Sequence, residues 1–344
     1  MKRRALFLGV ALLMPTAAGA KTAKRPKRQP PRKSAVAPAA AVPTARQPLL
    51  QARSQLVGFN ASAFPYRGFL PGTTRPFLDA RDGGRRGHTS VRGEVFWEAP
   101  TYSDRRSLIY LPPGFDAQKP ALIVLYLHGQ GATLERDVVV RQGVPRQIAE
   151  SQRNIALVAP QLAVDAADSS AGNFWKPGHF AAYLDESAER LMRLHGDRNA
   201  GRQFNMAPVV IVAYSGGYLP AAYALDRGGA SHRIRGVILM DALYGEEDKF
   251  AAWIAARRRQ AFLLSAFTES TREENATLQA LLQKRRVPFG RTLPASLTPG
   301  TVAFVNCGGP ERHGDFLINA WRPDPLQNAL SKIPGYLNRA KQGA

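Results

Sequence analysis

From residue 95 onward, short runs of consecutive apolar residues alternate with segments whose apolar residues recur every three or four positions. The run VVIV at 209–212 is of the first kind and is typical of a strand covered on both faces. The segment FAAYLDESAERLMRLHG at 180–196 is of the second kind, and its spacing indicates an amphipathic helix. This alternation predicts an α/β fold in which a mostly parallel sheet carries helices on both faces.

A serine stands where the apolar run at 209–212 changes into a helical pattern that begins near Tyr218. Small residues, Ala213 and Gly217, lie two positions before and after Ser215. Such a turn lets strand and helix pass closely and lifts the serine hydroxyl above the sheet, as in a nucleophile elbow. The alternative is a glycine-rich turn that cradles a phosphate, but no lysine or spaced glycine triplet follows. We therefore predict Ser215 as a nucleophile.

A second turn rich in glycine, HGQG at 128–131, follows the apolar run ALIVLYL at 121–127. Glycines on both sides of Gln130 leave the backbone free to aim an amide N–H at a developing oxyanion. A hydrolase with a serine elbow takes a second N–H from the residue after the nucleophile. The predicted oxyanion hole is therefore formed by the backbone N–H groups of Gln130 and Gly216. His128 is interpreted as a structural residue that orients this loop through its ring nitrogens.

Two later apolar runs each lead into a candidate catalytic side chain. The run at 237–240 ends at Asp241, and the run TVAFVN at 301–306 leads into a glycine-flanked loop that carries His313. A loop or capping role for Asp241 and a solvent-exposed loop role for His313 are the alternatives. The order along the chain is serine, aspartate, histidine, which differs from the chymotrypsin and subtilisin orders.

These motifs resemble those of the α/β-hydrolase superfamily over residues 95–340. The resemblance rests on AYSGG at 213–217, on the HGQG turn and on a histidine after the last strand. It implies an α/β-hydrolase fold and a serine hydrolase without a cofactor. In that mechanism Ser215 attacks an acyl carbon, His313 is the base, and Asp241 orients the imidazole.

The acid has two candidates. In most α/β-hydrolases it follows the next strand, where Glu269 is the only nearby carboxylate, whereas the position of Asp241 resembles that of pancreatic-type lipases. Asp241 directly follows an apolar run, while Glu269 follows Thr268 and could begin a helix near Thr271. The pattern favours Asp241 and leaves Glu269 open.

The loop AVDAADSSAGNFWKPGHF at 163–180 brings Phe174 and Trp175 near the expected site. These aromatics could bind substrate at the edge of the site, or they could cover the core. The segment is loosely similar to that of secreted esterases of the polyhydroxyalkanoate depolymerase and feruloyl esterase type. The short connection after Asp241 predicts no large lid domain.

The N-terminal sequence predicts export. Basic residues precede the apolar run at 5–14, and small residues end at Ala20, so residues 1–20 are a predicted signal peptide. An uncleaved anchor is the alternative, and no later segment predicts a membrane span. Residues 21–48 are basic and rich in proline and alanine, which predicts a disordered linker. We expect residues 49–94 to pack as an extension on a catalytic domain at 95–344.

The 344-residue chain has a formal net charge of +21, and its apolar content of 44% is sufficient for a core. Residues 1–46 hold 11 basic and no acidic groups, which leaves the remainder with 36 basic and 26 acidic groups. This charge favours an anionic envelope surface as a partner, although a solvated tether is the simpler reading. Nucleic acid is disfavoured because no binding motif accompanies the charge.

Cys307 is the only cysteine, so an internal disulfide is excluded, and its position at a strand end predicts a buried, unreactive thiol. No ligand spacing indicates a metal site, and no cofactor is expected.

Together these features predict an exported serine hydrolase, periplasmic or secreted, that acts on a small-molecule or polymeric ester. An amidase or peptidase acting on cell-wall material is one alternative. A non-catalytic protein that keeps the fold and binds an anionic polymer is another.

Overall fold

The computed structural model describes residues 48–338. The predicted signal peptide at 1–20 and nearly all of the predicted linker at 21–48 lie outside the described residues.

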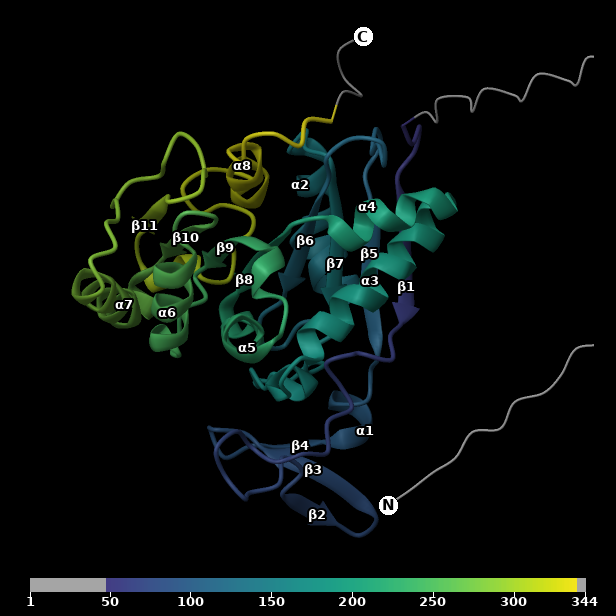
Figure 1. Cartoon of the computed structure of the whole chain (residues 1–344). Helices are drawn as coiled ribbons and strands as arrows, with labels where there is room; N and C mark the ends of the chain where they lie inside the picture. The colour runs from purple at the N-terminus through teal and green to yellow at the C-terminus, as the bar shows by residue number, and fades with distance from the viewer. Residues whose placement is uncertain (1–47, 339–344) are drawn as a thin grey trace, which may run out of the picture. The chain divides into compact units, whose positions relative to one another are not determined.

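An eight-stranded sheet forms the centre of the protein (Figure 1). Its order is β1 (Arg53–Gly58), β5 (Arg106–Leu111), β7 (Ile155–Pro160), β6 (Leu122–Leu127), β8 (Val209–Tyr214), β9 (Ile234–Met240), β10 (Phe262–Phe267) and β11 (Val302–Asn306). All pairs from β7 to β11 are parallel, whereas β5 is antiparallel to β7 and β1 is antiparallel to β5. The fold class expected from the apolar runs, a mostly parallel sheet, is confirmed.

Helices cover both faces of this sheet. One face carries α3 (His179–His195), α4 (Gly201–Met206), α5 (Tyr218–Arg227), α6 (Glu247–Arg257) and α7 (Arg272–Lys284). The other face carries a π-helical segment (Leu134–Arg141), α2 (Val144–Glu150) and α8 (Pro325–Ser331). Successive residues of β6 enter opposite cores, since Ile123 packs in one and Val124 in the other. This two-sided burial explains why the central strands are continuously apolar.

The N-terminal segment at 49–94 belongs partly to the main sheet. Its first strand, β1, pairs with β5 at the sheet edge, with Arg53 opposite Leu111. A domain boundary at residue 95 would therefore separate β1 from the sheet that it completes. Later residues of this segment form β2 (Ala80–Asp82) and β3 (Arg85–Thr89), which make a small antiparallel sheet with β4 (Val95–Trp97) just beyond it; α1 (Glu98–Thr101) follows.

The parallel strands place the candidate residues at one edge of the sheet. Strands β8, β9, β10 and β11 all end at the carboxyl edge of the sheet, where active sites of open α/β sheets lie. Helix α6 begins at Glu247, soon after β9 ends at Met240, so no domain is inserted at that point. Within residues 48–338, no helix is long and apolar enough to cross a membrane.

Candidate active site

Ser215 occupies a strained turn between β8 and α5. Its φ is +51°, in the left-handed region that residues with a side chain rarely adopt. The turn is tight because a side chain on Gly217 would collide with the carbonyl oxygen of Leu127 in β6. A Cβ on Gly129 would lie 2.8 Å from the Cβ of Ser215. The glycines are thus required by the close approach of two neighbouring strand ends, and the turn holds the Ser215 hydroxyl above the sheet.

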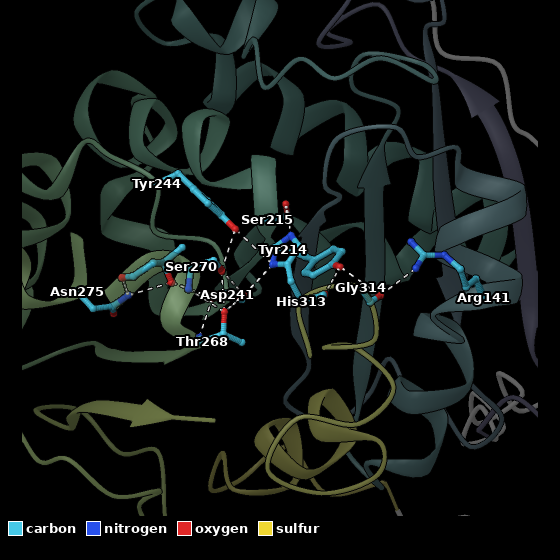
Figure 2. Close-up of polar contacts among 11 residues, drawn as sticks. Arg141, Tyr214, Ser215, Asp241, Tyr244, Thr268, Ser270, Asn275, His313 and Gly314 are labelled. Atoms are coloured by element: carbon cyan, nitrogen blue, oxygen red, sulfur yellow. Dashed lines mark hydrogen bonds and ion pairs between the residues drawn. The ribbon is translucent and has the colours of Figure 1, made fainter. Parts of the chain in front are cut away.

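Three of the predicted residues meet at the carboxyl edge (Figure 2). The Oγ of Ser215 lies 2.9 Å from Nε2 of His313. The Nδ1 of the same ring lies 2.7 Å from Oδ2 of Asp241. One imidazole therefore connects a hydroxyl on one side with a carboxylate on the other, which is the geometry that a serine nucleophile and its base require.

The Asp241 carboxylate is fully buried and held by several hydroxyl donors. Oδ1 accepts hydrogen bonds from the backbone N–H of Thr268 at 2.9 Å and from Oγ1 of Thr271 at 2.8 Å. Oδ2 accepts from Oγ1 of Thr268 at 2.7 Å and from Oγ of Ser270 at 3.2 Å. Burial by itself raises the pKa of Asp241, but the hydrogen bonds from His313 and from these neighbours outweigh it and hold the pKa below its ordinary value. Asp241 is therefore an ionised acceptor.

Glu269 lies apart from this arrangement. Its side chain is 38% exposed and forms an ion pair with Arg272, which lowers its pKa. The end of β10 serves the site in a different way, because Thr268, the residue before Glu269, donates two hydrogen bonds to Asp241. The structure thus places Asp241, and not Glu269, against the imidazole.

The loop that carries His313 is held by two side chains from other elements. Tyr214 stacks on the His313 ring with centroids 5.5 Å apart and donates from its hydroxyl to the His313 carbonyl at 2.6 Å. Arg141, at the end of the π-helical segment, donates to the carbonyl of Gly314 at 3.0 Å (Figure 2). The hydroxyl of Tyr244 lies 3.3 Å from Nδ1 of His313. Sequence reasoning missed these three residues, since no local pattern links them to the histidine.

The predicted oxyanion loop lies against the elbow. The backbone nitrogen of Gln130 is 3.3 Å from the position that a Cβ on Gly216 would take. The two predicted donors are therefore neighbours across the turn, and the loop is fixed further by a hydrogen bond from the N–H of Gly131 to the carbonyl of Ala166 at 2.8 Å.

His128 is buried at the start of the predicted oxyanion loop. Its Nε2 accepts hydrogen bonds from the N–H of Leu162 at 2.9 Å and from the side-chain amide of Gln161 at 3.0 Å. Nδ1 must then carry the proton, which it donates to the Gly129 carbonyl at 2.8 Å. Burial lowers the pKa of His128 to about 4, so the ring is neutral and supports the loop.

Of the two roles considered for Phe174 and Trp175, their burial contradicts substrate binding and supports the alternative that they cover the core. Phe174 is 1% exposed and packs on Tyr183, and Trp175 is 6% exposed and packs on Tyr66 and Tyr223. Both rings belong to the core on the α3 face. Residues 49–94 supply part of that aromatic cluster, a long-range packing that the local pattern does not reveal.

Within residues 48–338, no group of three or more histidine, cysteine, aspartate or glutamate side chains could hold a metal ion. Cys307 is half-buried, and burial raises its pKa to about 11, so its thiol stays protonated at neutral pH.

No family model and no curated protein matches the chain. Solved structures with a similar chain path include a feruloyl esterase module from Clostridium thermocellum, at 14% identity and a TM-score of 0.42 over 80% of this chain and 96% of that one. Another is an S-formylglutathione hydrolase from Agrobacterium tumefaciens, at 12% identity and a TM-score of 0.40 over 74% and 97%. A third is a dienelactone hydrolase from Anabaena variabilis, at 12% identity and a TM-score of 0.36 over 77% and 94%.

Proposed function

We propose that this chain is a serine hydrolase of the α/β-hydrolase type, a carboxylesterase that acts through an acyl-enzyme on Ser215. The observation that carries the proposal is the pair of contacts at His313, 2.9 Å to the Ser215 hydroxyl and 2.7 Å to the buried Asp241 carboxylate. A neutral hydroxyl is a weak nucleophile, and an adjacent imidazole oriented by a carboxylate activates it. The strained backbone at Ser215 supports the same assignment, because strain is retained where it positions a reacting group.

In the first half-reaction, Oγ of Ser215 attacks the acyl carbon of the ester while Nε2 of His313 takes its proton. The carbonyl electron pair moves onto oxygen, where the N–H groups of Gln130 and Gly216 stabilise the charge. The carbonyl then re-forms, the bond to the alcohol oxygen breaks, and His313 returns the proton to that oxygen. The alcohol leaves, and the acyl group remains on Ser215.

In the second half-reaction, water replaces the alcohol. The water oxygen attacks the acyl carbon while Nε2 of His313 takes a proton from the water. His313 then gives this proton to Oγ of Ser215 as the bond to the acyl carbon breaks, and the carboxylic acid product leaves. Asp241 keeps the proton of the neutral imidazole on Nδ1, so that Nε2 is free to act as base. It also stabilises the imidazolium that forms in each half-reaction. Its lowered pKa supports this role, since Asp241 stays ionised throughout.

We further propose that the protein is exported and then meets an anionic envelope surface. The proposal rests on the sequence of residues 1–20 and on the excess of basic over acidic groups along the whole chain. N-terminal sequencing of the protein recovered outside the cytoplasm should read from Lys21. Recovery of the intact N-terminus from the cytoplasm alone would refute export.

The activity is tested by labelling the purified protein with a fluorophosphonate probe and by following hydrolysis of p-nitrophenyl esters. We expect the wild type to be labelled and active, and Ser215→Ala to lose both. Glu269→Gln is the matched control, because it removes a nearby carboxylate that does not contact His313. A folded wild type that neither reacts with the probe nor hydrolyses the esters would contradict the proposal and favour a non-catalytic binding role.

A further inference from the structure

The loop between β7 and α3 reaches the predicted oxyanion hole through Ser169. Its Oγ accepts a hydrogen bond from the side-chain amide of Gln130 at 2.9 Å. The same Oγ lies 2.5 Å from the position that a Cβ on Gly216 would take, and the backbone nitrogen of Gln130 lies 3.3 Å from that position. The Cγ of Gln130 lies 2.9 Å from it. The Ser169 hydroxyl, the backbone N–H of Gln130 and Gly216 are therefore close neighbours, packed so tightly that residue 216 has no room for a side chain.

The proton of the Ser169 hydroxyl is available to a new acceptor. Gln130 Nε2 donates to Oγ, so this contact uses the hydroxyl as an acceptor and leaves its O–H free. Within residues 48–338, no hydrogen bond takes that proton. Ser169 is also only half-buried, whereas its neighbours Asp168 and Ser170 are buried. An acceptor that comes within reach of the Ser169 Oγ can thus take a hydrogen bond from it.

The position of Ser169 is fixed by the buried residue before it. Asp168 accepts a hydrogen bond from the hydroxyl of Tyr102 at 2.8 Å and two from Ser170, from its N–H at 3.2 Å and from its Oγ at 2.9 Å. Tyr102 is fully buried and packs edge-on against Phe77, with ring centroids 5.0 Å apart. The loop is therefore held in place before substrate binds, which is what makes a hydrogen-bond donor effective in a transition state.

We infer that the Ser169 hydroxyl is a third donor to the oxyanion, beside the N–H groups of Gln130 and Gly216. This inference rests on the proposed serine hydrolase function. When Ser215 bonds to the acyl carbon, the carbonyl electron pair moves onto oxygen, and Ser169 donates a hydrogen bond to that oxygen without transferring its proton. The interaction weakens again when the carbonyl re-forms. Because the oxygen carries its full negative charge only in the tetrahedral state, Ser169 stabilises that state more than it stabilises the bound substrate.

The test is steady-state hydrolysis of p-nitrophenyl butyrate by Ser169→Ala. We expect kcat to fall about 10²-fold with KM little changed, as for removal of one oxyanion donor. A boronic acid inhibitor, which forms a tetrahedral adduct on Ser215, should bind more weakly by a similar factor. Ser169→Thr keeps the hydroxyl and should recover much of the lost kcat. Ser170→Ala is the control for disturbance of the loop, since it removes a neighbouring hydroxyl that contacts only Asp168.

Two results would overturn the inference while the hydrolase function stands. The first is that Ser169→Ala keeps the kcat and the boronate affinity of the wild type, with normal probe labelling of Ser215. The second is an equal loss of kcat in Ser169→Ala and Ser170→Ala, which would assign the effect to loop packing. A wild type without labelling or turnover is a different failure, because it would refute the hydrolase function together with this inference.

Discussion

At the scale of single residues, the site depends on one imidazole held between a hydroxyl and a buried carboxylate. Asp241 receives hydrogen bonds from two threonines and a serine in addition to His313, so its orientation does not depend on His313 alone. Its backbone φ of +45° is a second sign that the surroundings impose its position. This environment fixes the Asp241 carboxylate, which under the proposed function orients the base, and it ties Asp241 to the local stability.

Asp241→Asn should lower kcat for p-nitrophenyl esters by about 10⁴-fold, because the amide favours the wrong tautomer of the imidazole. Ester hydrolysis measured with the folded variant checks this, and Glu269→Gln serves as the comparison. Equal losses in the two variants would contradict the assignment of the acid.

The lowered pKa of Asp241 also predicts a pH dependence of stability. A carboxyl whose folded pKa lies below its unfolded pKa of about 4 stabilises the protein above that pH, and the contribution is lost as pH falls through the folded pKa. Urea unfolding of wild type and Asp241→Asn should therefore differ most near neutral pH and converge under acid conditions. A difference that stays constant between these conditions would show that Asp241 titrates alike in both states.

At the scale of elements, the carboxyl ends of β6 and β8 approach so closely that their turns need glycine. Gly217→Ala would place a Cβ against the carbonyl of Leu127 and should destabilise the protein by roughly 1–3 kcal/mol, in line with overpacking. Gly58→Ala is the control, because nothing lies within 4 Å of its added Cβ. Chemical denaturation of both variants measures the effect, and equal stabilities would refute the close approach.

The π-helical segment acts on the site through the bond from Arg141 to the carbonyl of Gly314. Arg141→Gln should loosen the His313 loop and reduce kcat by up to about 10²-fold, since small displacements of a catalytic group are costly. Arg146→Gln removes an arginine of the next helix, α2, that pairs with Asp324 and Glu150. If both variants kept wild-type kcat, the Arg141 contact would have no positioning role.

At the scale of the whole molecule, the chain at 49–94 is joined to the sheet and to the core. Strand β1 covers the edge of β5, and the aromatic cluster around Phe77 supports the loop that carries Ser169. The early part of the chain therefore supports a loop of the candidate active site, whose other residues follow β8, β9 and β11.

A chain that begins at residue 48 should keep its thermal stability and ester hydrolysis, because it retains every described strand. A chain that begins at residue 59 loses β1 and leaves the β5 edge unpaired, so its Tm should fall. Thermal unfolding of the two proteins tests this. Identical Tm values would mean that β1 adds nothing to the stability of the sheet.

The amino-acid pattern by itself determined the fold class, and it predicted Ser215 and His313 as the nucleophile and base while it left the acid open between Asp241 and Glu269. Runs of apolar residues and small residues at a turn act over a few positions, so they are readable without knowledge of what packs against them. The pattern also located the Gln130 loop, because parallel strands place their following loops at one edge.

Only the tertiary structure decided which carboxylate meets the imidazole. Asp241 and Glu269 both follow strands, and the choice depends on side-chain direction and on the donors from Thr268 and Thr271. The burial of Phe174 and Trp175, the pairing of β1 and the place of Ser169 likewise depend on contacts between segments far apart in the chain. A local pattern indicates whether a side chain is buried, but not which distant segment buries it. For this physical reason, these features could be assigned only from the folded chain.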